Sequence, residues 1–279
     1  MSNQHYFIDQ EEIAEMYRLY KQGQLLTEMQ GGVLPEQPDF VGIHEVLDIA
    51  CGTAEWALLL AEQHPNVRVC GVDLSERITK FNQTTAKANR LQNTTFQVMD
   101  VTQGIGFPDH SFDLVNARLL FGFMTPEKWP TLIQECLRIL RPGGYLRMTE
   151  GDASLSNSFA SERLHILLTQ AIQDAGRSFL TGARHASVMP MLRSFFRNAG
   201  CIALQEHAYV LNYSAGMSAH DAWSSNVLSA FKLVQKFLVE SRVITPEEFG
   251  PLVEQLRDEM QQATFCAIVP FLTVWGKKP

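Results

Sequence analysis

The sequence of 279 residues lacks the segments that mark membrane and secreted proteins. It has no run of about 18 apolar residues, the minimum for a membrane-spanning helix. Its first residues contain neither a basic segment nor an apolar one, so no signal peptide is predicted. The five cysteines are widely separated, without CxxC pairs or the spacing of metal ligands. We therefore expect reduced thiols, no metal site and a cytoplasmic protein.

Positive charge is also scarce. The net charge is -7, and residues 1–150 hold 12 Lys and Arg against 19 Asp and Glu, whereas residues 151–279 hold 11 of each. No basic block stands out, so nucleic acid is not expected as a substrate or partner. The 46% hydrophobic content is that of an ordinary globular protein with a sizeable core.

Glycine-rich phosphate loops are missing as well, although one stretch has the layout of a nucleotide-binding turn. Residues 44–63 read HEVLDIACGTAEWALLLAEQ: a short apolar strand ending at Asp48, a turn of small residues, and a helix. The turn has one glycine, Gly52, instead of G-x-G-x-x-G, and Glu55 stands near the place a phosphate would take. The pattern predicts a ligand that approaches the backbone closely and carries no pyrophosphate.

The first 150 residues alternate strands with helices. Further strands are predicted at 66–74, 94–99, 112–117 and 145–149, with helices from Ser75 to about residue 90 and from Thr125-Pro126 to about residue 140. Such alternation requires a parallel sheet with right-handed crossovers. The predicted fold class is therefore α/β, with a Rossmann-like sheet.

The rest of the chain is predicted to be mostly helical, with helices at 161–176, 188–199, 219–240 and 245–262 and strands at 202–210 and 267–275. Thr245-Pro246-Glu247-Glu248 is typical of a capping box. An amphipathic helix over 11–20 and a second helical stretch around Leu25 precede the first strand. We expect a helical lid at 1–40, a ligand-binding core at 41–152, helical cap insertions at 153–186 and 212–263, and the last helix and strands of the core sheet at 187–211 and 264–279.

Five segments in this order resemble the motifs of class I S-adenosylmethionine-dependent methyltransferases: residues 48–54, 71–75, 99–101, 111–115 and 140–144. They look most like the small-molecule branch typified by quinone-biosynthesis C-methyltransferases. The resemblance implies a seven-stranded sheet whose last strand is antiparallel, and S-adenosylmethionine as the cofactor. Alanines stand at positions 50 and 54, where the family usually has glycine.

The resemblance also implies roles for individual residues. Asp48, Ala50 and Gly52 would lie under the methionine part of the cofactor, and Asp73 would bind both ribose hydroxyls. Around the adenine and the sulfonium, the implied contacts are Leu74, Asp100, Val101, Asn116 and Ala117.

Further motifs that the sequence lacks narrow the range of possible methyl acceptors. After the fourth strand there is neither an (Asp/Asn)-Pro-Pro-aromatic stretch nor an acidic metal cluster, and no Pro-Cys pair occurs. A small, largely apolar acceptor therefore fits best. Arg118 could hold an acidic group of the acceptor or pair with a nearby carboxylate. Candidates for a general base are Glu150, Asp152, His185 and His220, and candidates for acceptor contacts are Tyr20, Tyr213 and Trp223, each with a purely structural role as the alternative.

The leading hypothesis is methyl transfer from S-adenosylmethionine to an oxygen, nitrogen or carbon atom of a small metabolite. An enzyme that binds the same cofactor but catalyses a non-methylating reaction stays open, as does a non-catalytic binding module. The sequence does not indicate the acceptor, the attacked atom or the oligomeric state.

Overall fold

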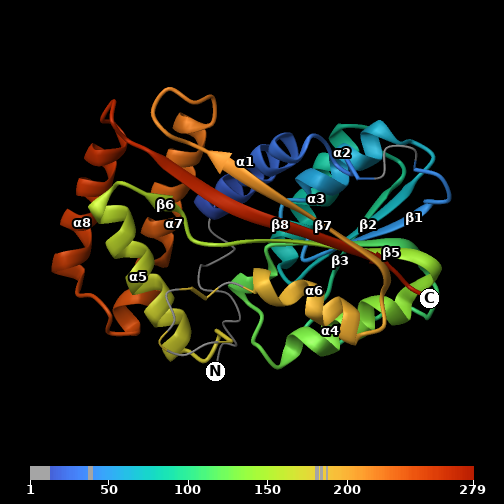
Figure 1. The fold of residues 1–279 in the computed structure, drawn as a ribbon. Helices are drawn as coiled ribbons and strands as arrows, with labels where there is room; N and C mark the ends of the chain where they lie inside the picture. Colours follow the sequence, from blue (N-terminus) through green and yellow to red (C-terminus); the bar gives the residue numbers. More distant parts are fainter. Residues whose placement is uncertain (1–12, 37–39, 180–181, 183–184, 187) are drawn as a thin grey trace.

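The computed structural model describes residues 13–36, 40–179, 182, 185–186 and 188–279. Its centre is an eight-stranded sheet in the order β3-β2-β1-β4-β5-β8-β6, with β7 paired to β8 (Figure 1). In chain order the elements are α1 (Ile13–Gln30), β1 (Glu45–Ile49), α2 (Glu55–Gln63), β2 (Arg68–Asp73), α3 (Glu76–Ala88), β3 (Thr94–Val98), β4 (Phe112–Arg118), the 3-10 turn η1 (Leu120–Gly122), α4 (Lys128–Ile139), β5 (Leu140–Gly151), β6 (Leu155–Ser156), α5 (Phe159–Asp174), α6 (Met189–Asn198), β7 (Ile202–Asn212), α7 (His220–Glu240), α8 (Pro246–Met260) and β8 (Ala267–Lys277).

The predicted α/β class is confirmed. Strands β1 to β5 pair in parallel, and β8 runs antiparallel between β5 and β7. The sheet has one strand more than the seven expected, because the two-residue β6 pairs with the beginning of β8. The carboxyl ends of β1 and β2 lie side by side, with Asp48 in register with Gly71. This edge is where open α/β sheets bind ligands.

The alternation of side chains along the strands builds a core on each face of the sheet. On one face, Leu47 and Ile49 of β1 pack with buried residues of α4 and α6. On the other face, Val46 packs with α2, whose Trp56 is fully buried. The sheet is therefore a middle layer with helices on both sides, which fixes the strand ends in space.

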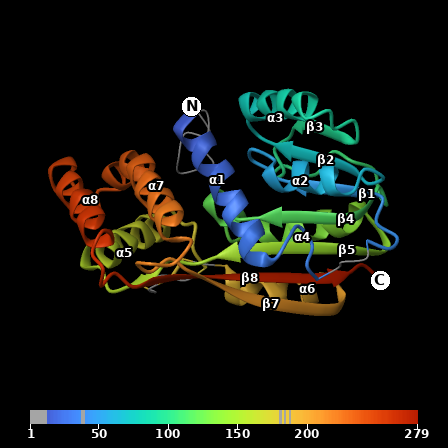
Figure 2. The ribbon, with the colours of Figure 1, turned by 90° about the horizontal axis from the view of Figure 1, so that it is seen from above.

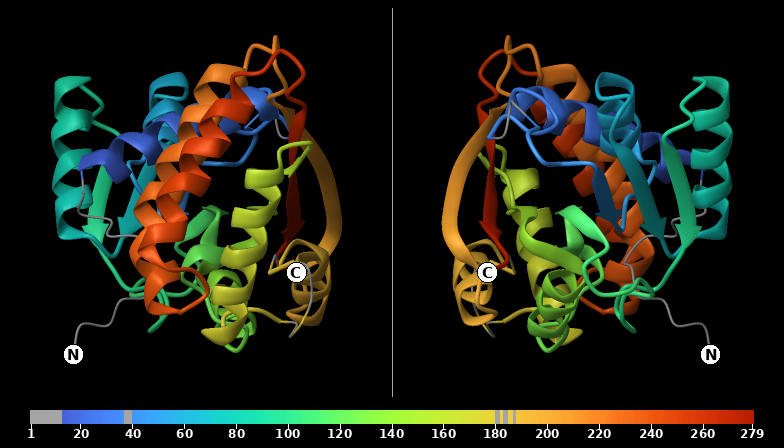
Figure 3. Two further views of the ribbon diagram at one scale, coloured as in Figure 1. Left: turned by 90° about the vertical axis from the view of Figure 1, so that its left-hand side faces the viewer. Right: turned by 90° about the vertical axis from the view of Figure 1, so that its right-hand side faces the viewer.

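A third core belongs to the cap helices α5, α7 and α8. It joins Phe231 of α7 and Phe249 of α8 to Phe271 of β8 and Leu26 of α1. Figures 1 and 3 show the three helices grouped beside one end of the sheet. The capping box at Thr245 that starts α8 is confirmed, as is the N-cap at Ser75 that starts α3. No described helix is long and apolar enough to cross a membrane.

Helix α1 is one continuous helix where two shorter stretches were predicted. It lies between the cap helix α7 and the core helix α2 (Figure 2). Because α1 is covered on two sides, polar residues such as Glu15 and Arg18 are buried along with Leu26. Its buried residues therefore do not form the single apolar stripe from which amphipathic helices are predicted. It stops at Gly31, whose φ of +85° suits glycine.

Candidate active site

The turn between β1 and α2 is left-handed at three alternate positions. Ala50, Gly52 and Ala54 have φ values of 50°, 51° and 54°. The amide of Cys51 donates to the carbonyl of Val72 (2.9 Å), which ties the turn to β2. The two alanines carry the strain of a left-handed backbone, and residues 50–54 before the helix have only small side chains, so the backbone there is open to a ligand.

Two buried carboxylates flank this turn. The Oδ2 atom of Asp73 accepts a hydrogen bond from the amide of Gly52 (2.9 Å), and Oδ1 accepts from the amide of Ser75 (3.0 Å). The Oδ1 atom of Asp48 accepts from Nδ2 of Asn116 (2.8 Å). Burial raises the pKa of both groups, that of Asp48 to about 6, although Arg118 and Asn116 act against the rise at Asp48. These carboxylates are suited to bind hydroxyl groups or a cation.

Both carboxylates line a cavity of about 310 Å³ that extends from the turn to the cap helices. Its sheet-side wall includes residues 50–53 and Ile78. Its cap-side wall is mostly apolar and includes Leu168, Ile172, Trp223, Val227, Phe231 and Phe271. The cavity thus combines a polar half against the strand ends with an apolar half under the cap.

An ion pair lines the same cavity. Nη2 of Arg118 lies 3.2 Å from Oε2 of Glu55, and Thr27 of α1 donates to that same oxygen (3.1 Å). Nη1 of Arg118 donates to Thr27 as well (3.0 Å). Gly23 leaves room for this group, because a Cβ atom there would lie 2.9 Å from Glu55 Oε2. Of the two predicted roles for Arg118, the structure shows the pairing with a carboxylate.

The remaining residues predicted to contact the cofactor do not line the cavity. Leu74 is 47% exposed beyond the end of β2. Asp100 accepts hydrogen bonds from the amide and hydroxyl of Thr102 (3.0 and 2.7 Å). Val101 and Ala117 are buried in the core, and Asn116 lies behind Asp48. These five lie around the cavity, on the strand ends and on the segments that follow them.

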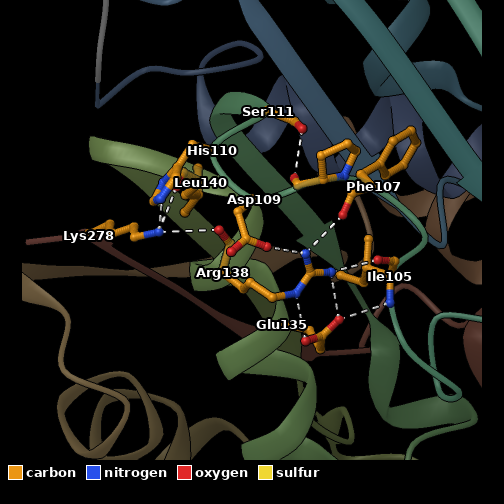
Figure 4. A network of polar contacts seen from close by, with 10 residues as sticks. Ile105, Phe107, Asp109, His110, Ser111, Glu135, Arg138, Leu140 and Lys278 are labelled. Carbon is orange, nitrogen blue, oxygen red and sulfur yellow. Dashed lines mark hydrogen bonds and ion pairs between the residues drawn. The ribbon is translucent and has the colours of Figure 1, made fainter.

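The loop after Asp100 is held in place by one arginine of α4 (Figure 4). Arg138 donates to the carbonyls of Ile105 (2.7 Å) and Phe107 (2.9 Å) and pairs with Asp109 and Glu135. Glu135 in turn accepts from the amide of Ile105 (3.2 Å). The network fixes the course of the chain from β3 to β4, and with it the position of Asp100.

Comparison with known proteins agrees with this geometry. A profile described as a methyltransferase domain matches residues 46–144. The methyltransferase pytC of Aspergillus terreus is 27% identical over 84% of this chain and 71% of its own length. The demethylmenaquinone methyltransferase of Listeria welshimeri is 35% identical over 36% of this chain and 42% of its own length. Among solved structures, phosphoethanolamine N-methyltransferase 2 of Haemonchus contortus, in complex with phosphomonomethylethanolamine and S-adenosylhomocysteine, aligns with a TM-score of 0.53 at 18% identity, over 92% of this chain and 52% of that one.

The domain match covers the strand ends, the turn and both carboxylates. The chain is a class I S-adenosylmethionine-dependent methyltransferase. Its core domain, from β1 into β5, is the part that this family shares, whereas the cap helices α5, α7 and α8 lie outside the matched residues.

Of the four candidate bases of the methyltransferase, Asp152 lines the cavity, whereas Glu150, His185 and His220 do not. Glu150 is fully buried and accepts from the amides of Leu120 (2.7 Å) and Phe121 (3.4 Å), and burial raises its pKa to about 8. His185 is exposed and lies 3.5 Å from Asp152, which does line the cavity. Nδ1 of His220 bonds to the carbonyl of Tyr213 (2.9 Å) at the start of α7. Glu150, His185 and His220 therefore contact other protein groups and do not face the cavity.

Of the three predicted acceptor contacts, the structure brings Trp223 into the cavity wall. Tyr213 is fully buried against Phe265 and does not line the cavity, and Tyr20 bonds to Gln24 on the outer part of α1. One lining residue that the sequence analysis missed is His165 of α5. A histidine on an amphipathic helix gives no sequence signal of its own, since only the packing of α5 on α7 turns it inward.

Proposed function

We propose that the methyltransferase binds S-adenosylmethionine in the polar half of the cavity and a small, largely apolar acceptor in the half under the cap. The observation that carries the proposal is the carboxylate of Asp73. It ends β2, is buried, lines the cavity and is oriented by two backbone amides. A carboxylate at the end of the second strand suits the two adjacent hydroxyls of a ribose.

The charges around the cavity fit this cofactor better than a dinucleotide. Among the described lining residues, four carboxylates (Asp48, Glu55, Asp73, Asp152) face two guanidinium groups, Arg18 and Arg118. A surplus of two negative charges attracts a sulfonium cation and repels a pyrophosphate. The open turn around Gly52 supplies the close backbone approach that the methionine part needs.

When bound, the cofactor supplies a methyl group activated by a positively charged sulfur. The residues of the chain align the acceptor with that group and keep water out, which can account for most of the rate in an in-line displacement. We assign the adenine side to Leu74, Asp100 and Val101, because they follow the ends of β2 and β3 next to Asp73. Asn116 and Ala117, near the end of β4, are assigned to the sulfonium side.

The acceptor is proposed from the cap-side wall. Its leucine, isoleucine, valine, phenylalanine and tryptophan side chains favour an apolar, partly planar molecule. The likeness to a demethylmenaquinone methyltransferase points the same way, since that name implies a quinone-type acceptor. Methyl transfer is favoured over a non-methylating reaction or a mere binding role, because the relatives with similar sequences, pytC and demethylmenaquinone methyltransferase, are named as methyltransferases.

Two further assignments belong to this proposal. The five cysteines are free, which favours a reducing compartment such as the cytoplasm. The negative net charge of -7 favours a small-molecule acceptor over nucleic acid.

Calorimetry tests the cofactor assignment. S-adenosylmethionine and S-adenosylhomocysteine should bind, and NAD should not. Asp73→Asn keeps the shape of the side chain but removes its charge, so we expect an affinity loss of about tenfold or more. Asp174→Ala, at the exposed end of α5, is the matched control and should bind normally. Unchanged affinity in Asp73→Asn, with a wild-type melting profile, would contradict the assignment.

A further inference from the structure

His165 projects from α5 into the apolar half of the cavity with one nitrogen engaged and the other free. Its Nδ1 atom lies 2.8 Å from the carbonyl oxygen of Ser161, one helical turn earlier. Its ring packs edge-on against Phe231 of α7, with 5.1 Å between ring centroids. No described residue forms a hydrogen bond with Nε2. The second ring nitrogen is therefore available to a molecule in the cavity.

The hydrogen bond to Ser161 fixes the tautomer. A carbonyl oxygen can only accept, so Nδ1 must carry the proton in this contact. In a neutral imidazole the other nitrogen, Nε2, then holds a lone pair and can accept a proton. Burial lowers the pKa of His165, with Ser161, Glu162 and Asp152 acting in the opposite direction, so the ring is neutral at neutral pH.

The surroundings of His165 limit what it can recognise. Its neighbours on the cavity wall include Leu168 and Phe231, which offer no hydrogen bonds, and Trp223, whose Nε1 can donate a hydrogen bond but cannot take up a proton. The guanidinium groups on the wall are already bound: Arg18 donates to Asn226 (3.1 Å) and pairs with Glu15, and Arg118 pairs with Glu55. Thr169 and Asn226 also line this wall, but neither side chain is basic. Among the lining residues of α5 and α7, the lone pair of Nε2 is therefore the group that can take up a proton.

From this geometry, and resting on the proposed function, we infer that His165 is the general base of the methyltransferase and that its acceptor is a planar, apolar molecule with a phenol-type hydroxyl group. A hydroxyl must lose its proton as it reacts, whereas a neutral amine already has a nucleophilic lone pair and needs no base beforehand. The presence of a base in the apolar half of the cavity therefore favours an acceptor with a hydroxyl group over one with an amine.

The step balances with groups already named. The hydroxyl oxygen bonds to the methyl carbon while the bond from sulfur to that carbon breaks, and its electron pair stays on sulfur. The hydroxyl proton passes to Nε2 of His165. The resulting imidazolium is stabilised by the nearby carboxylates of Asp152 and Glu162 and later releases the proton to solvent.

Two probes that differ only in the hydroxyl test the inference without any turnover. Calorimetry with S-adenosylhomocysteine bound compares 4-methylphenol, which keeps its proton at neutral pH, with 4-methylanisole, in which the hydroxyl is methylated. The wild type should prefer 4-methylphenol by about tenfold, the value of one good hydrogen bond. His165→Asn places an amide nitrogen where Nδ1 was, which keeps the bond to Ser161 but removes Nε2. We expect this variant to lose the preference and to keep its affinity for S-adenosylhomocysteine.

His220→Asn is the matched control, because His220 also bonds to a backbone carbonyl through Nδ1 but lies outside the cavity. It should retain the preference. Imidazole ¹⁵N spectra of the wild type give a second reading without substitution: the Nε2 resonance of His165 should shift on adding 4-methylphenol and not on adding 4-methylanisole. Equal binding of the two probes, binding of neither, or a preference that survives in His165→Asn would overturn the inference. Failure of the wild type to bind S-adenosylhomocysteine would instead contradict the proposed function.

Discussion

Glu150 makes the stability of the protein depend on pH in a calculable way. Its carboxyl is fully buried behind the turn η1, and burial raises its pKa from 4.5 to about 8. Because the folded value lies above the unfolded one, this group stabilises the fold fully below the unfolded pKa, and the contribution is lost as pH rises through about 8. Between roughly pH 6.5 and roughly pH 8.5 the loss amounts to about 2 kcal/mol.

Replacing Glu150 by glutamine isolates this contribution. The amide oxygen can still accept from the amide of Leu120, as Oε1 of Glu150 does at 2.7 Å, but the side chain no longer titrates. Urea unfolding at a series of pH values gives the free energy of unfolding of both proteins. We expect the wild type to lose about 2 kcal/mol more than Glu150→Gln over that range. Asp48 also titrates with a raised pKa, but its value of about 6 places most of its effect at lower pH.

Glu62→Gln, an exposed substitution on α2, serves as the control and should follow the wild-type profile. If the profiles of wild type and Glu150→Gln are parallel, Glu150 is ionised in the folded protein at neutral pH. The description of this residue as a buried, protonated support for η1 would then be refuted.

Two further predictions concern the turn and the ion pair beside it. Ala50→Gly should raise the free energy of unfolding by about 0.5–1 kcal/mol, because it removes the strain of a left-handed alanine. Ala54→Gly should gain less in the same urea series, since its methyl group is fully buried. Arg118→Met leaves Glu55 buried without its partner and should cost about 2–4 kcal/mol. The double variant with Glu55→Gln should recover at least half of that loss, and independent, additive effects would show that the pair is not coupled.

The parts of the site that the sequence predicted are those encoded locally. Asp48 and Asp73 each end an apolar strand, and parallel strands bring such ends to one edge of the sheet. The turn around Gly52 follows within four residues of Asp48 and has its own signature of small side chains. Strand alternation, a capping hydroxyl and a strand-end carboxylate are short-range signals, so they could be read without the tertiary structure.

The parts that could not be predicted depend on packing between distant segments. Arg118 and Glu55 are 63 positions apart, and no local pattern pairs them. His165 lines the cavity because α5 packs on α7. The sequence of α5 alone does not distinguish this arrangement from one in which His165 faces solvent. For α1, burial on two sides hides the stripe on which helix prediction depends. Local sequence thus predicts which residues form the polar half of the cavity, whereas tertiary contacts decide which residues line its apolar half.

A buried chain of hydrogen bonds connects Asp48, which the sequence predicted, to segments that are distant in the sequence. Arg147 of β5, only 1% exposed, donates through Nη1 to Oδ1 of Asn116 (2.9 Å) and pairs through Nε with Glu36, beyond the end of α1. With its oxygen held by a cation, Asn116 must turn its Nδ2 toward Asp48, which it reaches at 2.8 Å. The orientation of the Asp48 carboxylate therefore depends on a segment more than ten residues before it in sequence.

That dependence gives α1 a part in shaping the cofactor half of the cavity. Gln30, at the end of the helix, accepts from Nη2 of Arg147 (3.3 Å) and donates to Thr273 of β8 (3.1 Å). In the last turn of the same helix, Thr27 donates to Glu55 beside the turn between β1 and α2. A shift of α1 would disturb the hydrogen bonds of the Asp48 and Glu55 carboxylates together, since buried polar groups need their partners. The helix that precedes the shared core therefore does more than form part of the cavity wall: its position also sets the hydrogen bonds of Asp48 and Glu55, which line the polar half of the cavity.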